Sequence, residues 1–83
     1  PETWIPFDLA EETDVDLNIY SSEGLLIREM NLGRKPAGSY RDKTEALYWN
    51  GKNQQGELVT SGVYFYRIQA GDYSQMRKMV ILK

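Results

Sequence analysis

Four carboxylates near the start of the chain are the residues best suited to chemistry. Glu11, Glu12, Asp14 and Asp16 supply the groups that a glycosidase pair or a calcium site requires. Asp14 and Asp16 alternate with apolar residues, however, which places them on the polar face of a strand. The sequence contains no histidine and no cysteine, which removes the usual zinc sites, Ser-His triads and thiol nucleophiles. We therefore predict a solvated strand face, with no catalytic residue, no metal and no cofactor.

A second oxygen-rich segment, residues 50–56, resembles a calcium loop in its amide content. It offers no carboxylate until Glu57 and carries Lys52 near its centre, whereas calcium prefers anionic oxygens. The dipeptide Asn50-Gly51 tolerates positive φ and favours tight turns. We interpret this segment as a turn.

Aromatic residues suggest a different kind of site, a stacking platform for sugars or peptides. Its members would be Tyr48, Trp49, Tyr64 and Tyr66. Tyr64 and Tyr66 share one strand face, and Arg67 lies on the other. This arrangement predicts that the two tyrosines point into a core and that Phe65 is the aromatic most available to a partner. A sugar platform would require Tyr48 and Trp49 to face solvent.

The elements that position these residues are predicted to be strands. Residues 14–20 alternate strictly and put Val15, Leu17 and Ile19 on one face, which indicates a half-buried strand. Residues 4–9 form a short run whose Pro6 cannot donate a ladder hydrogen bond and so marks an edge strand. Further strands are predicted at residues 25–30, 46–49, 56–59, 62–70 and 79–82, with a break in the pattern at residues 33–38.

The last two predicted strands are joined by Gly71-Asp72, which fits a two-residue type II′ turn with glycine first. That turn sets Tyr64 opposite Met79 and Val63 opposite Val80. About seven short strands, turn signals roughly every ten residues and no helical periodicity predict an all-β fold, an antiparallel immunoglobulin-like β-sandwich.

Composition limits the function classes. The 83 residues are enough for one domain with one core, and the formal net charge is −2. Nucleic-acid binding needs clustered lysine and arginine, which this acidic chain lacks. No apolar run reaches the roughly 18 residues that a membrane span needs. The chain begins at Pro1 without the features of a signal peptide, so we expect residues 1–83 to be excised from a larger protein.

The terminal segment, residues 79–82, is apolar on both faces. In a two-layer sandwich only one face of a strand is covered. Either a loop shields the outer face or the strand exposes an apolar strip that another protein covers. An unpaired edge would add docking by strand addition, and an ordinary last strand of the sheet is the alternative.

Several segments taken together resemble a known family. The motifs are Trp49-Asn50-Gly51, then Gly56, then residues 61–67 (Ser-Gly-Val-Tyr-Phe-Tyr-Arg), then Ala70-Gly71-Asp72 and the terminal residues 77–83. This succession resembles the C-terminal secretion-sorting domain of type IX secretion cargo, type A style, and the related immunoglobulin-like domain of the flagellar hook-capping protein. Residues 1–7 and 15–24 extend the resemblance over nearly the whole chain, while Asn50 stands where family members usually have aspartate.

The resemblance implies a noncatalytic C-terminal module that directs secretion or surface attachment of a larger bacterial protein. Its partner would be secretion machinery or a cell-surface protein, and its location the outside or the surface of a Gram-negative cell. The family ties recognition to the basic terminal strand. The resemblance therefore implies Arg77, Lys78, Met79, Val80, Ile81, Leu82 and Lys83 as candidate partner-binding residues, and Phe65 joins them as the aromatic that alternation leaves most available to a partner.

Two other hypotheses stay open beside the sorting module. A structural assembly module, hook-cap-like, predicts self-association through a sheet edge or through Phe65. A carbohydrate-binding module predicts a row of exposed aromatics on one face. Immunoglobulin-like sandwiches host many unrelated functions, so the fold by itself does not choose between them.

Overall fold

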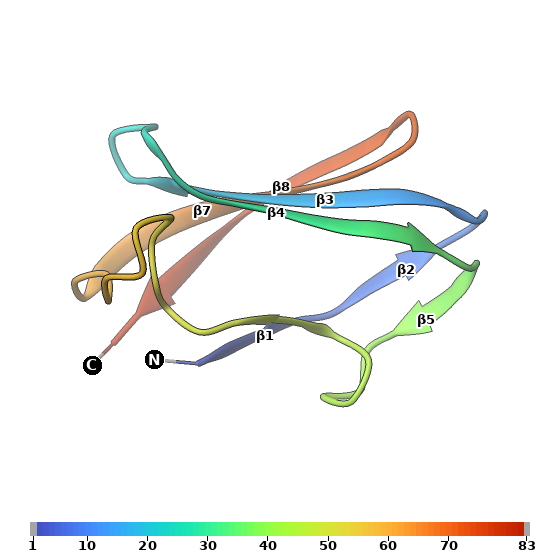
Figure 1. The fold of residues 1–83 in the computed structure, drawn as a ribbon, viewed down its shortest axis with the longest axis horizontal. Coiled ribbons are helices and arrows are strands. Elements are labelled where there is room, and N and C mark those ends of the chain that lie inside the picture. Colours follow the sequence, from blue (N-terminus) through green and yellow to red (C-terminus); the bar gives the residue numbers. More distant parts are fainter. Residues whose placement is uncertain (1, 83) are drawn as a thin grey trace.

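The computed structural model describes residues 2–82, which form strands joined by turns and loops (Figure 1). The strands are β1 (Thr3–Ile5), β2 (Phe7–Leu9), β3 (Thr13–Ser21), β4 (Leu26–Lys35), β5 (Gly38–Tyr40), β6 (Leu47–Trp49), β7 (Gly62–Ala70) and β8 (Tyr73–Ile81). In the described part of the chain there is no helix with the length and hydropathy needed to cross a membrane.

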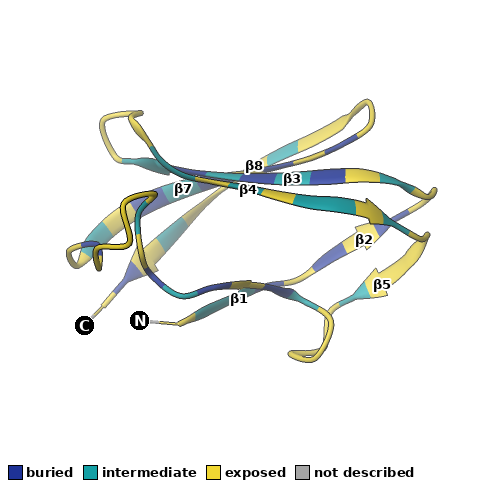
Figure 2. Ribbon diagram, in the orientation of Figure 1, coloured by how far each residue is buried: buried dark blue, intermediate teal, exposed yellow. Residues whose placement is uncertain are grey.

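One layer is a four-stranded antiparallel sheet with the order β4-β3-β7-β8. β3 pairs with β4 on one side and β7 on the other, and its inward residues Val15, Leu17 and Ile19 are each 0% exposed while the residues between them are more accessible. Figure 2 shows this alternation along β3. The strand predicted at residues 14–20 is confirmed.

The other layer consists of two antiparallel pairs, β1 with β6 and β2 with β5, which lie across from the four-stranded sheet (Figure 1). Pro6 separates β1 from β2, because its nitrogen has no hydrogen to donate to a ladder. The predicted run at residues 4–9 is therefore two short strands. Phe7 and Tyr40 face each other across the second pair, with ring centroids 4.6 Å apart and nearly parallel rings.

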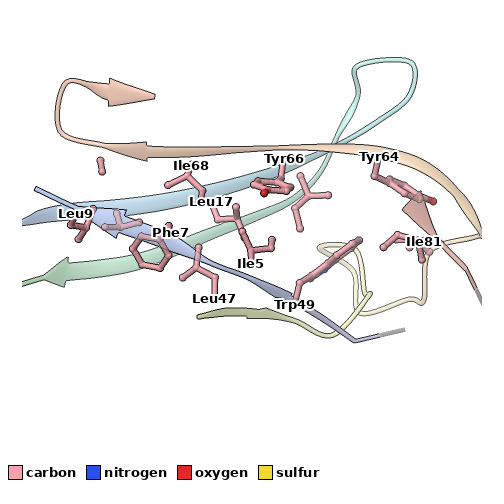
Figure 3. Close-up of a cluster of buried hydrophobic side chains, with 14 residues drawn as sticks. Ile5, Phe7, Leu9, Leu17, Leu47, Trp49, Tyr64, Tyr66, Ile68 and Ile81 are labelled. Atoms are coloured by element: carbon pink, nitrogen blue, oxygen red, sulfur yellow. The ribbon is translucent and has the colours of Figure 1, made fainter. Parts of the chain in front are cut away.

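The core fills the space between the two layers (Figure 3). Trp49 is 0% exposed, and its ring meets that of Tyr64 edge to face at 6.2 Å. The indole Nε1 donates to the carbonyl oxygen of Lys52 at 2.9 Å, so the buried polar atom of this side chain is satisfied. Tyr64 and Tyr66 are 7% and 9% exposed, which confirms that they point inward.

The hairpin between β7 and β8 has the predicted register, with Tyr64 opposite Met79 and Val63 opposite Val80. Gly71 has a φ of +62°, and no non-glycine residue of the described chain has positive φ. A positive φ at the first central position alone is what a type II′ turn requires.

Several predicted boundaries were wrong: the strand predicted at residues 79–82 begins at Tyr73, and β5 begins at Gly38, in the segment predicted to break the pattern. The pattern does not break at Gly33, because β4 continues to Lys35 and Leu32 is the extra residue of a β-bulge: Val15 pairs with Gly33, and Asp16 with Asn31. Gly33 has a φ of +75°, which glycine alone adopts without strain, so this glycine marks a bulge inside a strand.

Residues 56–59 form no strand and contribute only an isolated bridge between Lys52 and Leu58. The apolar pair Leu58-Val59 suggested a strand, and that prediction was wrong. Val59 is buried in the core although it lies in a loop, and Leu58 is exposed. Burial without ladder pairing produces the same local alternation as a short strand.

Candidate partner-binding surface

β8 lies at one edge of the four-stranded sheet and carries most of the predicted partner-binding residues. Their side chains divide between two faces because side chains alternate along a strand. Met79 is partly buried against the core and Ile81 is 3% exposed, so both belong to the inner face. Lys78 and Val80 lie on the outer face.

Two predicted residues lie near the end of the chain, and one faces the second layer. Leu82 follows β8 and is 77% exposed. Lys83 lies outside the described residues. Arg77 is exposed, and its position opposite the buried Tyr66 places it on the inner face of the sheet, near the gap between the layers.

The outer face of the sheet carries a connected set of apolar side chains, which we call the outer apolar row. Its members are Tyr20, Leu26, Val63, Phe65 and Val80. Cross-strand pairing connects Tyr20 to both Leu26 and Phe65, and Val63 to Val80. Leu26 and Val80 are 51% and 58% exposed. The structure thus brings Phe65 and Val80 together with Val63, which the predicted register already placed opposite Val80, and with Tyr20 and Leu26, which the sequence did not single out.

Phe65 is partly buried, as predicted, and pairs across the ladder with Lys78. It is not the most accessible aromatic, since Tyr48 and Tyr73 are 45% and 53% exposed. Tyr48 lies on the outer face of the two-stranded pair β1–β6, and Tyr73 flanks the β7–β8 turn. The strand position of Phe65 predicted its face, whereas accessibility depends on the neighbours that cover a ring.

An opening between the two layers lies beside β8. It is a cavity of about 410 Å³ lined by Pro6, Phe7, Asp8, Arg41, Tyr66, Tyr73, Gln75 and Arg77. Arg41 donates from Nε to the carboxylate of Asp8 at 3.1 Å, and this hydrogen bond lowers the pKa of Asp8. Burial raises the pKa of the Tyr66 hydroxyl, and the positive charge of Arg77 partly opposes that shift.

Of the carboxylates considered for acid–base or metal chemistry, Glu12 forms an ion pair and the two aspartates lie on a strand face. Glu12 accepts a hydrogen bond from Arg34 at 2.8 Å on an exposed surface. Asp14 is exposed and Asp16 is partly buried on the outer face of the sheet, where alternation placed them. Within residues 2–82, no three histidine, cysteine, aspartate or glutamate side chains are grouped to hold a metal ion.

The segment at residues 50–57 is a turn built by its amides. Asn53 Oδ1 accepts from the backbone nitrogens of Gln55 and Glu57 at 3.0 and 2.9 Å. Asn50 Oδ1 accepts from the backbone nitrogen of Lys52 at 3.0 Å. These side-chain oxygens thus bind backbone nitrogens of the same loop, which is the usual behaviour of asparagine in turns.

The aromatic platform proposed for sugars does not form from the predicted residues, since Trp49 is fully buried. Tyr48 instead packs against Trp4, with centroids 5.5 Å apart and rings tilted by 55°. Lys43 lies over Trp4 at 4.5 Å, and the Tyr48 hydroxyl donates to Glu2 at 2.7 Å. The tilted rings, one covered by a cation, give no flat row for sugar rings.

The two layers and their connections define an immunoglobulin-like β-sandwich module. The structure matches that of FlgD from P. aeruginosa with a TM-score of 0.74 and 22% sequence identity, over 96% of this chain and 59% of that chain. The chain thus spans about three fifths of that protein's length, and the match shows the fold. A search of curated proteins found no match.

The family model "FlgD Ig-like domain" matches residues 5–74 of the chain. The chain therefore belongs to the family of FlgD immunoglobulin-like domains. This confirms the relation to the hook-capping protein.

Proposed function

We propose that this domain is a noncatalytic assembly module that holds together copies or components of a larger bacterial protein structure. The observation that carries the proposal is the outer apolar row on the open sheet of a domain from the FlgD immunoglobulin-like family. Contiguous apolar groups on a soluble surface are characteristic of interaction sites. The hook-cap-like hypothesis thus takes precedence over the sorting hypothesis.

The chemistry of the surface supports a binding role. The chain has no histidine or cysteine, and its exposed carboxylates Asp8 and Glu12 are engaged by arginines. Lys78 and Arg67 border the outer apolar row through their pairing with Phe65 and Asn18. An apolar centre with a polar border is the usual anatomy of a protein interface.

Sedimentation of the purified domain over a range of concentrations tests this proposal. We expect concentration-dependent association, and Val80→Lys should shift its midpoint upward by about tenfold, since a buried apolar contact of this size contributes about 1.5 kcal/mol. Leu58→Lys is the matched control, because Leu58 is similarly exposed but lies in a loop and is not a member of the row. A wild-type domain that stays monomeric throughout would contradict self-assembly.

The sorting hypothesis remains a second candidate because β8, the strand that the resemblance ties to recognition, is an edge strand. A partner can contact such a strand without dismantling the sheet. Under this hypothesis the domain is exported to the surface or the outside of a Gram-negative cell by secretion machinery.

Reporter export tests the sorting hypothesis if only exposed residues are changed. Substituting Lys78, Val80 and Leu82 together by glutamate alters the strand's outer face and leaves Ile81 in the core. Loss of export from a host that possesses type IX secretion, with the circular dichroism of the domain unchanged, would support sorting. Unchanged export would exclude these side chains as the signal.

A further inference from the structure

The two edges of the four-stranded sheet are treated differently by the rest of the chain. At the β4 edge, the backbone nitrogen of Gln54 donates to the carbonyl oxygen of Ile27 at 2.8 Å, and Gln54 Oε1 accepts from the backbone nitrogen of Glu29 at 2.9 Å. Arg28 Nη1 also donates to the carbonyl of Lys52 at 3.0 Å. The loop at residues 50–58 therefore caps the first part of the β4 edge, at residues 27–29, which is one of the ways in which native sheets protect an edge.

The β8 edge has no such cap in the described part of the chain. In a two-residue hairpin the pair that flanks the turn, here Ala70 and Tyr73, exchanges hydrogen bonds across the ladder. The next residue, Ser74, and every second one after it therefore direct their backbone groups away from β7. These residues are Ser74, Met76, Lys78 and Val80, and β8 pairs with β7 alone among the described strands.

β8 lacks the backbone irregularities that make an edge unsuitable for pairing, although it carries two charges. It runs for nine residues without proline, glycine or a register shift. Lys78 and Arg77 at its centre disfavour pairing with a second β8, because like charges facing each other across a ladder are destabilising. They do not disfavour a strand that brings negative charge.

The opening beside β8 supplies a second, independent feature. A strand added to β8 would point every second side chain toward this cavity, which already contains the exposed Arg77. With the Gln75 amide oriented so that its oxygen faces Arg77, Oε1 accepts from Nε at 2.8 Å and from Nη2 at 2.6 Å. The same orientation lets the Gln75 nitrogen donate to the Tyr73 hydroxyl at 2.9 Å, which fixes the amide.

Arg77 is the cation of the opening that is free to pair with an incoming acid. The two ion pairs of the described residues are Arg34 with Glu12 and Arg41 with Asp8, so Arg41 is already neutralised. Gln75 orients Arg77 without neutralising it. A guanidinium held in this way favours a carboxylate, because charge-assisted hydrogen bonds are stronger than neutral ones.

We propose that β8 is a strand-addition site for an extended segment of a partner protein that carries an acidic side chain on its inward face, opposite Arg77, and apolar side chains on its outward face beside Met76 and Val80. Backbone pairing provides affinity and the acid provides specificity. The inference rests on the proposed function, since it names the kind of partner; it adds the backbone edge of β8 and Arg77, and shares only Val80 with the outer apolar row.

Titration of the isotope-labelled domain with a synthetic peptide, followed by NMR, tests the proposal. The probe is an acetylated and amidated nine-residue peptide of alternating threonine and valine with one glutamate at its central threonine position. We expect shifts concentrated at the amides of Ser74, Met76, Lys78 and Val80. A peptide with lysine in place of glutamate should bind about tenfold more weakly, as the loss of a charge-assisted pair implies.

Two variants assign the effect to Arg77. Arg77→Gln should abolish the preference for glutamate over lysine, whereas Arg67→Gln, which removes a charge from the outer face of β7, should preserve it. Two further peptides, N-methylated on alternate residues so that each blocks one edge, separate strand pairing from nonspecific contact. We expect that only one of them binds.

Three results would overturn the proposal: no binding of the glutamate peptide, shifts centred on Phe65 or on β4, or equal binding of both N-methylated peptides. Each differs from failure of the proposed function, which sedimentation of the wild-type domain measures without any peptide. Association of the domain with no peptide binding would retain the assembly module and reject the β8 site.

Discussion

Tyr64 and Tyr66 occupy the same strand face and are buried to similar extents, yet their hydroxyl groups differ. Tyr64 donates from its hydroxyl to the carbonyl oxygen of Thr60 at 2.8 Å, whereas the Tyr66 hydroxyl lies at the opening beside β8. We expect Tyr64→Phe to lower the free energy of unfolding by about 1 kcal/mol, because a carbonyl acceptor loses its partner. Urea denaturation measures this loss.

Tyr66→Phe is the internal control for that substitution. It removes the same atom from the same sheet face and should change the free energy of unfolding by less than about 0.5 kcal/mol. Equal losses in the two variants would mean that the Thr60 contact does not stabilise the fold.

Tyr66 also predicts a dependence of stability on alkaline pH. Burial raises its pKa above the ordinary value, with Arg77 acting in the opposite direction. A group whose pKa is higher in the folded state contributes stability that is complete below the unfolded pKa of about 10 and is lost as pH rises through the folded pKa. The difference in stability between wild type and Tyr66→Phe should therefore be constant near neutral pH and change above about pH 10.

Urea midpoints of both proteins across the alkaline range measure this difference. Because every other group titrates in both proteins, their difference isolates Tyr66. Parallel curves above about pH 10 would show that the hydroxyl remains as accessible to ionisation in the folded state as in the unfolded chain.

At the scale of elements, the β7–β8 turn depends on Gly71. Its φ is +62°, and a Cβ added there would lie 3.1 Å from Thr13 Oγ1. Gly24 has a φ of +86°, but a Cβ added at that position would have no neighbour within 4 Å. We expect Gly24→Ala to cost about 1 kcal/mol from backbone strain alone, and Gly71→Ala to cost more, about 2 kcal/mol.

Thermal and urea denaturation of the two glycine variants measure these costs, and the Gly71→Ala/Thr13→Ala double variant separates strain from contact. Removing the hydroxyl should recover part of the Gly71→Ala loss. No recovery would assign the entire loss to the backbone.

The strands that the sequence predicted well are those in which pairing and burial agree. β3 alternates because one of its faces is buried, and the Gly71-Asp72 turn fixed the register of β7 and β8. The strand predicted at residues 56–59 was wrong because Val59 is buried although it lies in a loop. The break predicted at Gly33 was wrong because a glycine can mark either a bulge or the end of a strand. Only the pairing with β3 distinguishes the two.

The sequence identified some residues of the candidate surface, but it did not predict which residues lie next to one another there. Val80 and Phe65 were identified, whereas Tyr20 and Leu26 join them only through pairing across β3. Gln54 gave no local signal, because its effect on the β4 edge depends on a contact 25 residues away in the chain. A long-range cap of this kind has no short sequence pattern.

At the scale of the whole molecule, one strand serves both the core and the surface. β8 closes the sandwich through Met79 and Ile81, and presents Lys78 and Val80 outward. Removal of the strand therefore cannot test its recognition role separately from its structural role. Substitutions on the outer face can do so, because they leave the inner face unchanged.

Truncation should show this division directly. We expect a chain ending at Ile81 to stay folded, because Leu82 is 77% exposed, and a chain ending at Arg77 to unfold, because it loses Met79 and Ile81 from a small core. Ile81→Ala should lower the free energy of unfolding by about 3 kcal/mol, an effect between those of the two truncations that can still be measured. Circular dichroism and the fluorescence of the buried Trp49 report the outcome for all three proteins. A cooperative unfolding transition in the chain ending at Arg77 would show that the last four residues of β8, including Met79 and Ile81, are not needed to hold the sandwich together.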